Sequence, residues 1–176
     1  MENLLPLVYL SILLAILSAT TWLIFRQVFK TRKVETTLTR LQNKLKDEKG
    51  TAQEYYELGS IYLDKRLFSQ SVPVFQKALK EAEEETPENT ALIYNGLGFA
   101  YFSQEQYDLA IRNYKEAIKL QPNYVTAFNN LGHAYEKKKL ESPALQAYDE
   151  ALKYEPNNAI AKRRAESLRK RLVPSK

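Results

Sequence analysis

Cysteine is absent from this 176-residue chain, histidine occurs once, and there are only five glycines. Without cysteine there is no disulfide framework, no thiolate zinc site, no iron–sulfur cluster and no cysteine nucleophile. A single histidine excludes any site that requires two imidazoles, such as the helical motif of zinc proteases. Because glycine is scarce and no glycine-rich nucleotide motif occurs, a phosphate-binding loop is not expected. The length corresponds to about one domain with accessory segments.

Positive charge is concentrated in two segments that flank the middle of the chain. The formal net charge is +5, yet residues 26–50 carry eight Lys or Arg against three Asp or Glu. Residues 159–176 carry seven against one, whereas residues 51–90 carry four against eight. The basic character therefore belongs to two flanking segments, and no nucleic-acid partner is predicted for the domain between them.

The longest uncharged segment runs from Leu4 to Phe25, and 17 of its 22 residues are apolar. A helix of this length spans ~33 Å, which is enough to cross a bilayer core. A cleaved signal peptide is the alternative, but it requires a positively charged beginning, and only Met1, Glu2 and Asn3 precede the apolar run. Residues 1–25 are therefore predicted to form an uncleaved transmembrane anchor.

Basic residues follow the apolar segment directly, and none precedes it. They are Arg26, Lys30, Arg32 and Lys33. The positive-inside rule then predicts that the remainder of the chain lies on the cytoplasmic side of the membrane, or on its stromal equivalent in a plastid.

Residues 26–51 are predicted to form a basic amphipathic linker helix. A single apolar stripe recurs at spacings of four, three and four residues, at Val34, Leu38, Leu41 and Leu45. Two heptads are fewer than a coiled coil requires, so a stalk helix that packs on the first repeat or on the membrane is favoured over dimerisation. Gly50 marks the expected end of this helix.

From Ala52 onward the chain repeats itself. The pair Leu58-Gly59 recurs as Leu97-Gly98 and Leu131-Gly132, at offsets of 39 and then 34 residues. The same offsets relate further columns: Tyr62, Tyr101 and Tyr135; Ser71, Ala110 and Ala144; Phe75, Tyr114 and Tyr148; Ala78, Ala117 and Ala151. This pattern is typical of the tetratricopeptide repeat, in which each unit is a pair of antiparallel helices. It predicts three units, at 52–85, 91–124 and 125–158.

The units are not equally regular. Asp108 and Ser142 are predicted to cap the second helices of their units. In the first unit, serine replaces the usual alanine at position 71 and Pro73 follows. The acidic stretch 81–90 then inserts five extra residues before the second unit. The first unit is therefore predicted to be the least regular and the most mobile.

Residues 159–176 are predicted to form a basic capping helix. Its apolar face can cover the exposed end of the third unit, as a terminal cap must. That face consists of Ile160, Ala161, Ala165, Leu168 and Leu172. The basic residues on the other faces are predicted to be solvated, and contact with an acidic partner or an anionic lipid is the alternative. The fold class is thus all-α, with a transmembrane helix, an α-solenoid of three repeats and a capping helix.

No group of residues indicates catalysis. His133 lies alone in the first helix of the third unit, and the carboxylates are scattered on solvated helix faces without a defined pair. The chain is therefore predicted not to be an enzyme and to need neither metal nor cofactor.

The concave surface of the solenoid, formed by the first helix of each unit, is the predicted site of protein binding. Its residues are Gln53, Tyr56, Ser60, Asn95, Phe99, Phe102, Asn129, Asn130, His133 and Arg163. Asparagine amides can bond the backbone of an extended peptide, and the two phenylalanines offer apolar anchors; ordinary packing between helices is the alternative for each residue. The carboxylate clamp of co-chaperones is disfavoured, because Tyr56, Thr126 and Asn130 occupy the places of its basic residues.

The order of segments resembles one known family. The anchor LVYLSILLAILSATTWLIFRQV, the basic stalk, the three repeats and the basic cap together resemble the photosystem I assembly tetratricopeptide proteins of cyanobacteria and plastids. The stretch LGHAYEKKKL and the segment ALQAYDEALKYEPNNAIAKRRAESLRKRL are similar to the C-terminal part of that family.

The resemblance implies a thylakoid membrane protein with cytoplasmic or stromal repeats. It also implies a scaffold that assists photosystem I assembly or stability by holding a subunit in the groove. A protein-import receptor of an organelle or envelope, or another membrane-tethered adaptor, is the alternative. An anchored enzyme is a further class, for which no catalytic group is found.

Overall fold

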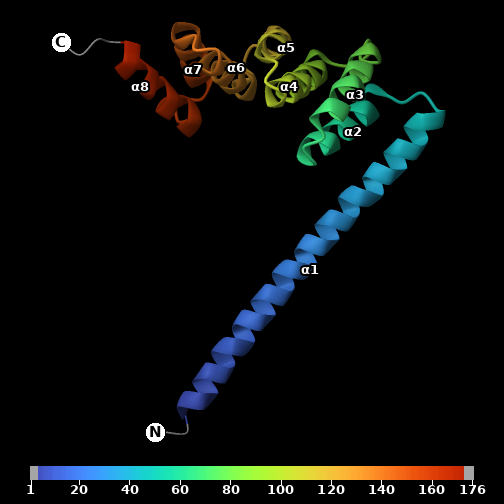
Figure 1. Ribbon diagram of the computed structural model, residues 1–176, viewed down its shortest axis with the longest axis vertical. Helices are drawn as coiled ribbons and strands as arrows, with labels where there is room; N and C mark the ends of the chain where they lie inside the picture. The colour runs from blue at the N-terminus through green and yellow to red at the C-terminus, as the bar shows by residue number, and fades with distance from the viewer. Residues whose placement is uncertain (1–3, 173–176) are drawn as a thin grey trace. The chain divides into compact units, whose positions relative to one another are not determined.

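Residues 4–172 are described by a computed structural model, in which α-helices are the regular secondary structure (Figure 1). The helices are α1 (Leu4–Asp47), α2 (Ala52–Asp64), α3 (Phe68–Lys80), α4 (Pro87–Ser103), α5 (Tyr107–Leu120), α6 (Val125–Lys137), α7 (Glu141–Tyr154) and α8 (Ala159–Leu172). This confirms the all-α class. The first three residues of the predicted anchor and the last four of the predicted cap lie outside the described residues.

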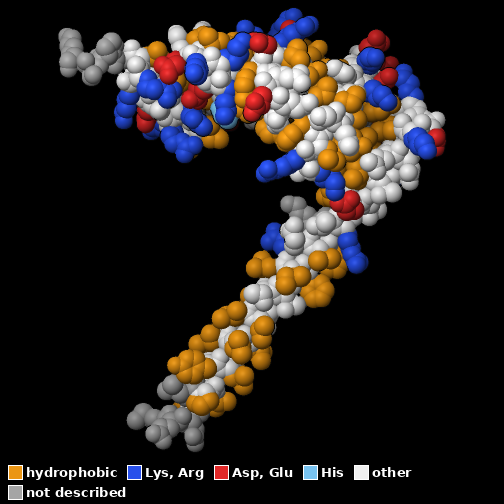
Figure 2. Space-filling model, viewed as in Figure 1, with side chains coloured by type: hydrophobic (Ala, Val, Ile, Leu, Met, Phe, Trp, Pro, Cys, Tyr) orange, Lys and Arg blue, Asp and Glu red, His pale blue; other side chains and the backbone are white. Residues whose placement is uncertain are grey.

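The described residues divide into two units, one that ends at residue 47 and one that begins at residue 48. Within the described part of the first unit, α1 is one unbroken helix, so the predicted anchor and most of the predicted linker are continuous. Apolar side chains cover its first half (Figure 2). By length and composition α1 is able to span a membrane, because its most apolar 18-residue window has a mean hydropathy of 2.2.

The second unit is a series of helical hairpins, in which α2 pairs with α3, α4 with α5 and α6 with α7. Two residues after the end of α2, α4 and α6 the chain enters the left-handed region, at Arg66 (φ 59°), Glu105 (φ 61°) and Lys139 (φ 60°). The next amide then donates back across the last turn, as the Leu140 N–H does to the Tyr135 carbonyl at 2.9 Å. This is the Schellman motif, which ends the helix and turns the chain into its partner helix.

The repeated glycines lie where an aromatic ring from the second helix presses on the first. A Cβ atom at Gly98 would come within 2.7 Å of the Tyr114 ring, and one at Gly132 within 2.7 Å of the Tyr148 ring. In the first hairpin the ring of Phe75 meets Gly59 at 2.9 Å in the same way. In each hairpin, the repeated glycine of the first helix therefore contacts the repeated aromatic residue of the second helix.

The predicted helix caps at Asp108 and Ser142 are wrong. The N-cap residues of α5 and α7 are Gln106 and Leu140, and neither makes a side-chain capping hydrogen bond. The cause is the Schellman turn: the residue that closes the first helix also begins the second, as the Leu140 carbonyl accepts from the Ala144 N–H. Asp108 instead forms an ion pair with Lys138.

The second of the three repeats, predicted at 91–124, begins before residue 91 in the structure. Thr86 caps α4 by accepting a hydrogen bond from the Asn89 N–H at 3.3 Å, and Pro87 occupies the first turn, where its missing N–H is tolerated. Part of the acidic insertion is therefore helical. In the first unit, α3 continues through Pro73.

The last helix, α8, continues the register of the repeat. Its buried residues Ala161, Ala165 and Leu168 follow the buried residues Ala127, Leu131 and Ala134 by 34 positions. They pack on Ala144, Tyr148 and Ala151 of α7. The helix α8 therefore takes the place of the first helix of a fourth unit and covers the core of the third.

Candidate partner-binding surface

The first helices α2, α4, α6 and α8 form one side of the solenoid, called here the first-helix surface. α2 contacts α4, and α4 contacts α6. Two side-chain contacts join the residues predicted for this surface. The Asn130 amide donates to the Asn95 side-chain carbonyl at 3.0 Å, and the rings of Phe102 and His133 lie 4.8 Å apart. The structure thus brings predicted residues from different repeats together.

The tyrosine side chain of Tyr124 contacts the asparagine pair. Burial raises the pKa of the Tyr124 hydroxyl, Tyr56 raises it further, and a hydrogen bond with Asn95 opposes the rise. Tyr56 also lies 6.0 Å from the ring of Phe75. Tyr124 was not predicted from the sequence, because it lies just before α6, where the repeat columns assign no side chain to the surface. Its position directly before the repeat unit 125–158 is the signal that was available.

Asn129 supports α8. Its amide donates to the Asn158 side-chain oxygen at 3.2 Å, and the same oxygen accepts from the Ala161 N–H at 3.0 Å. The side-chain oxygen of Asn129 is buried without a hydrogen-bond partner in the described structure. The Asn129 amide is therefore already engaged within the protein. Asn158, which was not predicted from the sequence, links Asn129 to the first turn of α8. The signal was an asparagine shortly before a helix, which is a typical N-cap.

The two phenylalanines of α4 differ in accessibility. Phe99 is 41% exposed, whereas Phe102 is half-buried and contacts Tyr107 at 5.5 Å as well as His133. Phe102 also packs against the core formed by α5, α6 and α7. Phe99 is therefore an apolar side chain that is available to a partner. Phe102 packs against the core and is also partly exposed on the first-helix surface.

Three further predicted residues are exposed or half-buried on α2 and α8. Gln53 and Arg163 are exposed, and Ser60 is half-buried. Gln53 and Ser60 belong to α2 and Arg163 to α8, so the predicted set extends over all four first helices.

A carboxylate at the end of α6 is held by three partners. The Tyr148 hydroxyl donates to Glu136 at 2.7 Å, and Arg164 and Arg171 approach the other oxygen at 3.6 and 3.7 Å. Burial, followed by this hydrogen bond, raises the pKa of Tyr148. Burial also lowers the pKa of His133, and the charge of Arg164 lowers it further. The negative charge of Glu136 is therefore compensated within the protein.

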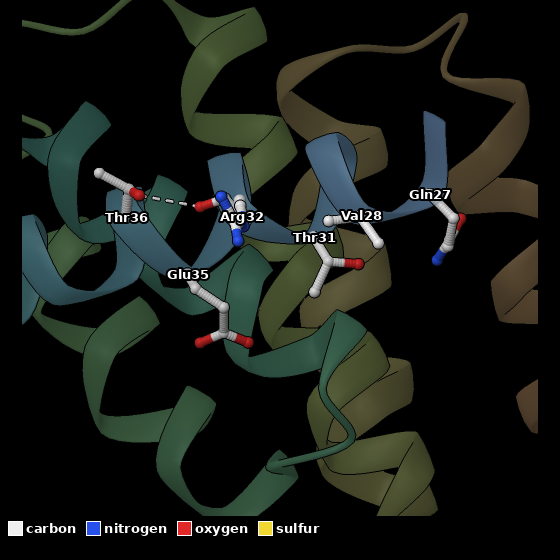
Figure 3. Close-up of a pocket in the computed structure, with 6 residues that line it drawn as sticks. All are labelled: Gln27, Val28, Thr31, Arg32, Glu35 and Thr36. Carbon is white, nitrogen blue, oxygen red and sulfur yellow. Dashed lines mark hydrogen bonds between the residues drawn. The ribbon is translucent and has the colours of Figure 1, made fainter. Parts of the chain in front are cut away.

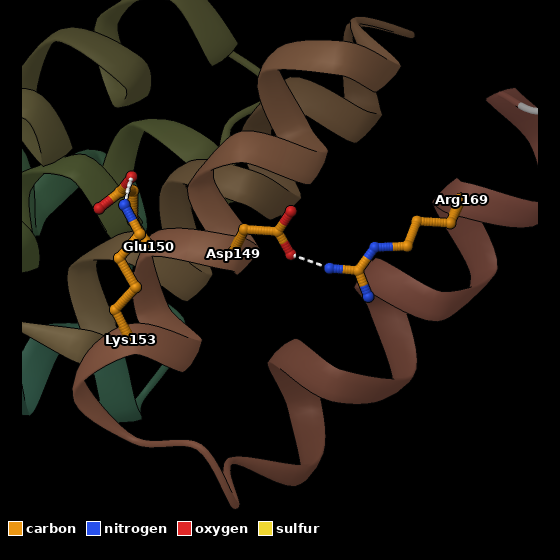
Figure 4. A network of polar contacts seen from close by, with 4 residues as sticks. All are labelled: Asp149, Glu150, Lys153 and Arg169. Atoms are coloured by element: carbon orange, nitrogen blue, oxygen red, sulfur yellow. Dashed lines mark hydrogen bonds and ion pairs between the residues drawn. The ribbon is translucent and has the colours of Figure 1, made fainter.

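The basic face of α8 is only partly solvated, which corrects the prediction. Arg169 pairs with Asp149 of α7 at 2.5 Å (Figure 4), and Arg171 pairs with Glu141 at 2.9 Å. With the contact of Arg164, three arginines of α8 bind the third repeat. Lys162, Arg163 and Lys170 are the exposed basic residues that make no such pair in the described structure.

A metal or small-molecule site does not emerge from the described residues. Between residues 4 and 172, no cluster of three or more His, Asp or Glu is arranged to hold a metal ion. A hollow beside α1 is lined by six residues of that helix (Figure 3), where the Thr36 hydroxyl donates to the Arg32 carbonyl at 2.9 Å. These residues come from a single helix and include no nucleophile paired with a base.

Comparison with known proteins identifies the class. The family model for the tetratricopeptide repeat matches residues 52–85 and 125–158, and a second one described as TPR repeat matches residues 100–139. The crystal structure of MamA has a similar fold, with a TM-score of 0.73, 21% identity and 81% of each chain covered. The first TPR domain of Spaghetti (RPAP3), bound to an HSP90 peptide, has a TM-score of 0.64 and 20% identity, covering 72% of this chain and 97% of that one. The protein is a tetratricopeptide-repeat protein, a class whose domains bind protein partners.

Two relatives define the family. The chain is 36% identical to ycf37 of Guillardia theta over 125 residues, which cover 71% of this chain and 70% of that protein. It is 36% identical over 119 residues to the chloroplastic tetratricopeptide repeat domain-containing protein PYG7 of Arabidopsis thaliana, covering 68% of this chain and 39% of PYG7. The chain belongs to the family that contains ycf37 and PYG7, as the sequence resemblance predicts.

Proposed function

We propose that the protein is a membrane-anchored scaffold that assists photosystem I assembly or stability by holding a segment of a subunit on its first-helix surface. One observation carries the proposal. The first helices of successive repeats, joined by the Asn95–Asn130 hydrogen bond, present the exposed ring of Phe99 on one side of the solenoid. An exposed aromatic ring beside ordered amides suits the capture of an extended protein segment.

The location belongs to the same proposal. The apolar half of α1 is long enough to anchor the chain in a thylakoid membrane. The basic residues that follow it favour repeats on the cytoplasmic or stromal side. An anchor also confines the repeats near membrane subunits, so a modest intrinsic affinity is sufficient.

A protein-import receptor is the second candidate, and the charges of the first-helix surface argue against it. Such a receptor would bind amphipathic, positively charged targeting segments and would favour an acidic groove. Here the surface ends at α8 with the exposed residues Arg163 and Lys170. These charges repel a basic segment.

Affinity purification from solubilised membranes tests the proposal with two matched variants. Phe99→Ala removes a ring that is 41% exposed on α4, and Leu109→Ala removes a side chain that is 40% exposed on α5 of the same repeat. We expect Phe99→Ala to reduce the recovery of photosystem I subunits, by about 1–2 kcal/mol of binding free energy. Leu109→Ala should leave the recovery unchanged, and thermal unfolding of both variants should resemble that of the original protein.

Normal folding of Phe99→Ala with unchanged recovery of subunits would move the binding surface away from the first helices. Recovery of precursor proteins in place of photosystem subunits would favour the import receptor.

A further inference from the structure

The first-helix surface changes its chemical character from α4 to α8. Positions 34 residues apart are equivalent, so Asn95 of α4 and Asn129 of α6 correspond to Arg163 of α8. In the same way Phe102 of α4 corresponds to Lys170 of α8. The burial pattern of α8 follows the same register, which gives these equivalences a structural basis. The surface is therefore neutral and apolar at α4 and basic at α8.

The transition occurs at α6, around His133. This ring lies against Phe102. Burial lowers the pKa of His133, the positive charges of Arg164 and Lys137 lower it further, and Glu136 opposes the shift. Both cations are thus close enough to influence a group on the first-helix surface. Because Glu136 is 15% exposed and held by Tyr148 and two arginines, it offers a partner little negative charge.

The basic end is exposed to solvent. Lys137, Arg163 and Lys170 are all exposed, and space-filling colours show Lys and Arg side chains gathered over α8 (Figure 2). Their charge is not needed to hold the cap, since Arg164, Arg169 and Arg171 make the ion pairs with the third repeat. The exposed cations are therefore available to an external anion.

We infer that the segment held on the first-helix surface is an acidic peptide segment with an apolar side chain. The apolar side chain lies on Phe99, and the acidic side chains lie towards Lys137, Arg163 and Lys170. The inference rests on the proposed function and adds the chemistry and the direction of the bound segment. Opposite charges across an interface raise the association rate and exclude partners of the wrong sign.

A displayed library of random linear peptides provides the probe. The full chain is embedded in nanodiscs of zwitterionic lipid, so that anionic headgroups do not compete, and peptides are selected on it. We expect the selected peptides to combine Asp or Glu with an aromatic or aliphatic residue. Their affinity should fall as salt is raised, because exposed charges are screened beyond about 10 Å at 0.1 M.

Two charge reversals on α8 form a matched pair. Arg163→Glu changes a residue of the first-helix surface, whereas Lys162→Glu changes its exposed neighbour. Lys162 corresponds to Tyr94 and Phe128, which pack towards the second helix of a unit, so it faces the free end of the solenoid. We expect Arg163→Glu to weaken the selected peptides about tenfold and Lys162→Glu to change their affinity much less. Lys170→Glu gives a second reversal should Arg163→Glu alter the thermal unfolding of the protein.

The outcomes separate the inference from the function on which it rests. Peptides that require Phe99 but carry no excess of Asp or Glu would overturn the inference and leave the proposed function standing. Equal losses for Arg163→Glu and Lys162→Glu would also overturn it, since the attraction would then be a general property of the cap. If no selected peptide depends on Phe99, the proposed function itself fails.

Discussion

Single residues decide how closely the two helices of a repeat approach. At Gly98 the Tyr114 ring occupies the space that a side chain would need. A Cβ atom on Gly98 would lie 2.7 Å from the nearest carbon of that ring. Tyr114 is 1% exposed, so its ring has no room to move aside, and burial raises the pKa of its hydroxyl. The helix pair therefore depends on the absence of a Cβ atom at this position.

Gly98→Ala should lower the free energy of unfolding by about 1–3 kcal/mol, because it overpacks this contact. Chemical denaturation of the variant measures the loss. In a Tyr114→Leu background the same substitution should lose less stability, since the ring it meets has been removed. An equal loss in both backgrounds would show that the ring contact is not the cause.

The left-handed residue in each hairpin turn is a second constraint at this scale. Lys139 adopts φ 60°, which glycine tolerates and other residues adopt at a cost. Lys139→Gly should therefore raise the free energy of unfolding by about 0.5–1 kcal/mol. Lys137→Gly, at the last residue of α6, should lower it by a similar amount because glycine weakens a helix. Thermal unfolding of the two variants should shift in opposite directions, and two shifts downward would contradict the account.

At the scale of elements, α8 is attached to the repeats by its apolar face and by its first turn. The side chain of Asn158 accepts from the Ala161 N–H and from the Asn129 amide, so one oxygen joins α8 to α6. Arginines of α8 add ion pairs with α6 and α7. These polar contacts fix the position of the cap over the core it covers.

Asn158→Ala should reduce stability by about 1–2 kcal/mol, because it removes the helix cap and leaves the Asn129 amide without its partner. Asn157→Ala, at the exposed neighbouring residue, is the control and should change stability by less than about 0.5 kcal/mol. Urea denaturation distinguishes the two. Similar losses at both positions would mean that the turn, not the Asn158 side chain, supports α8.

The helices and turns also show how much of the fold could be predicted from the sequence alone. The columns of Gly, Ala and aromatic residues predicted three hairpins, because repetition amplifies a weak local signal. The apolar face of residues 159–176 predicted the capping helix. The prediction that Asp108 and Ser142 are the N-cap residues of α5 and α7 was wrong. The turn before each of these helices is formed by backbone hydrogen bonds, which side-chain preferences do not indicate. Among the candidate site residues, the roles of Asn129 and Phe102 in packing depend on contacts with Asn158 and Tyr107, which periodicity does not specify.

At the scale of the whole molecule, the proposed function requires repeats that face the cytoplasm or stroma. Arg26, Lys30, Arg32 and Lys33 follow the apolar segment, and no basic residue precedes it in the sequence. Added protease should therefore digest the repeats in membranes that expose this face. Exchanging these four residues for glutamine while placing lysines near Glu2 should produce inverted molecules. Complete protection of the repeats on this face would contradict the assigned orientation.

The central claim is that a photosystem I subunit lies on the first-helix surface, and site-specific photo-crosslinking tests it most directly. A photoreactive amino acid is placed at position 99 or at position 109, which are similarly exposed in α4 and α5 of one repeat. After irradiation of intact membranes, adducts are identified by mass spectrometry. The account predicts an adduct with a photosystem I subunit from position 99 and none from position 109. An adduct from position 109 without one from position 99 would contradict it.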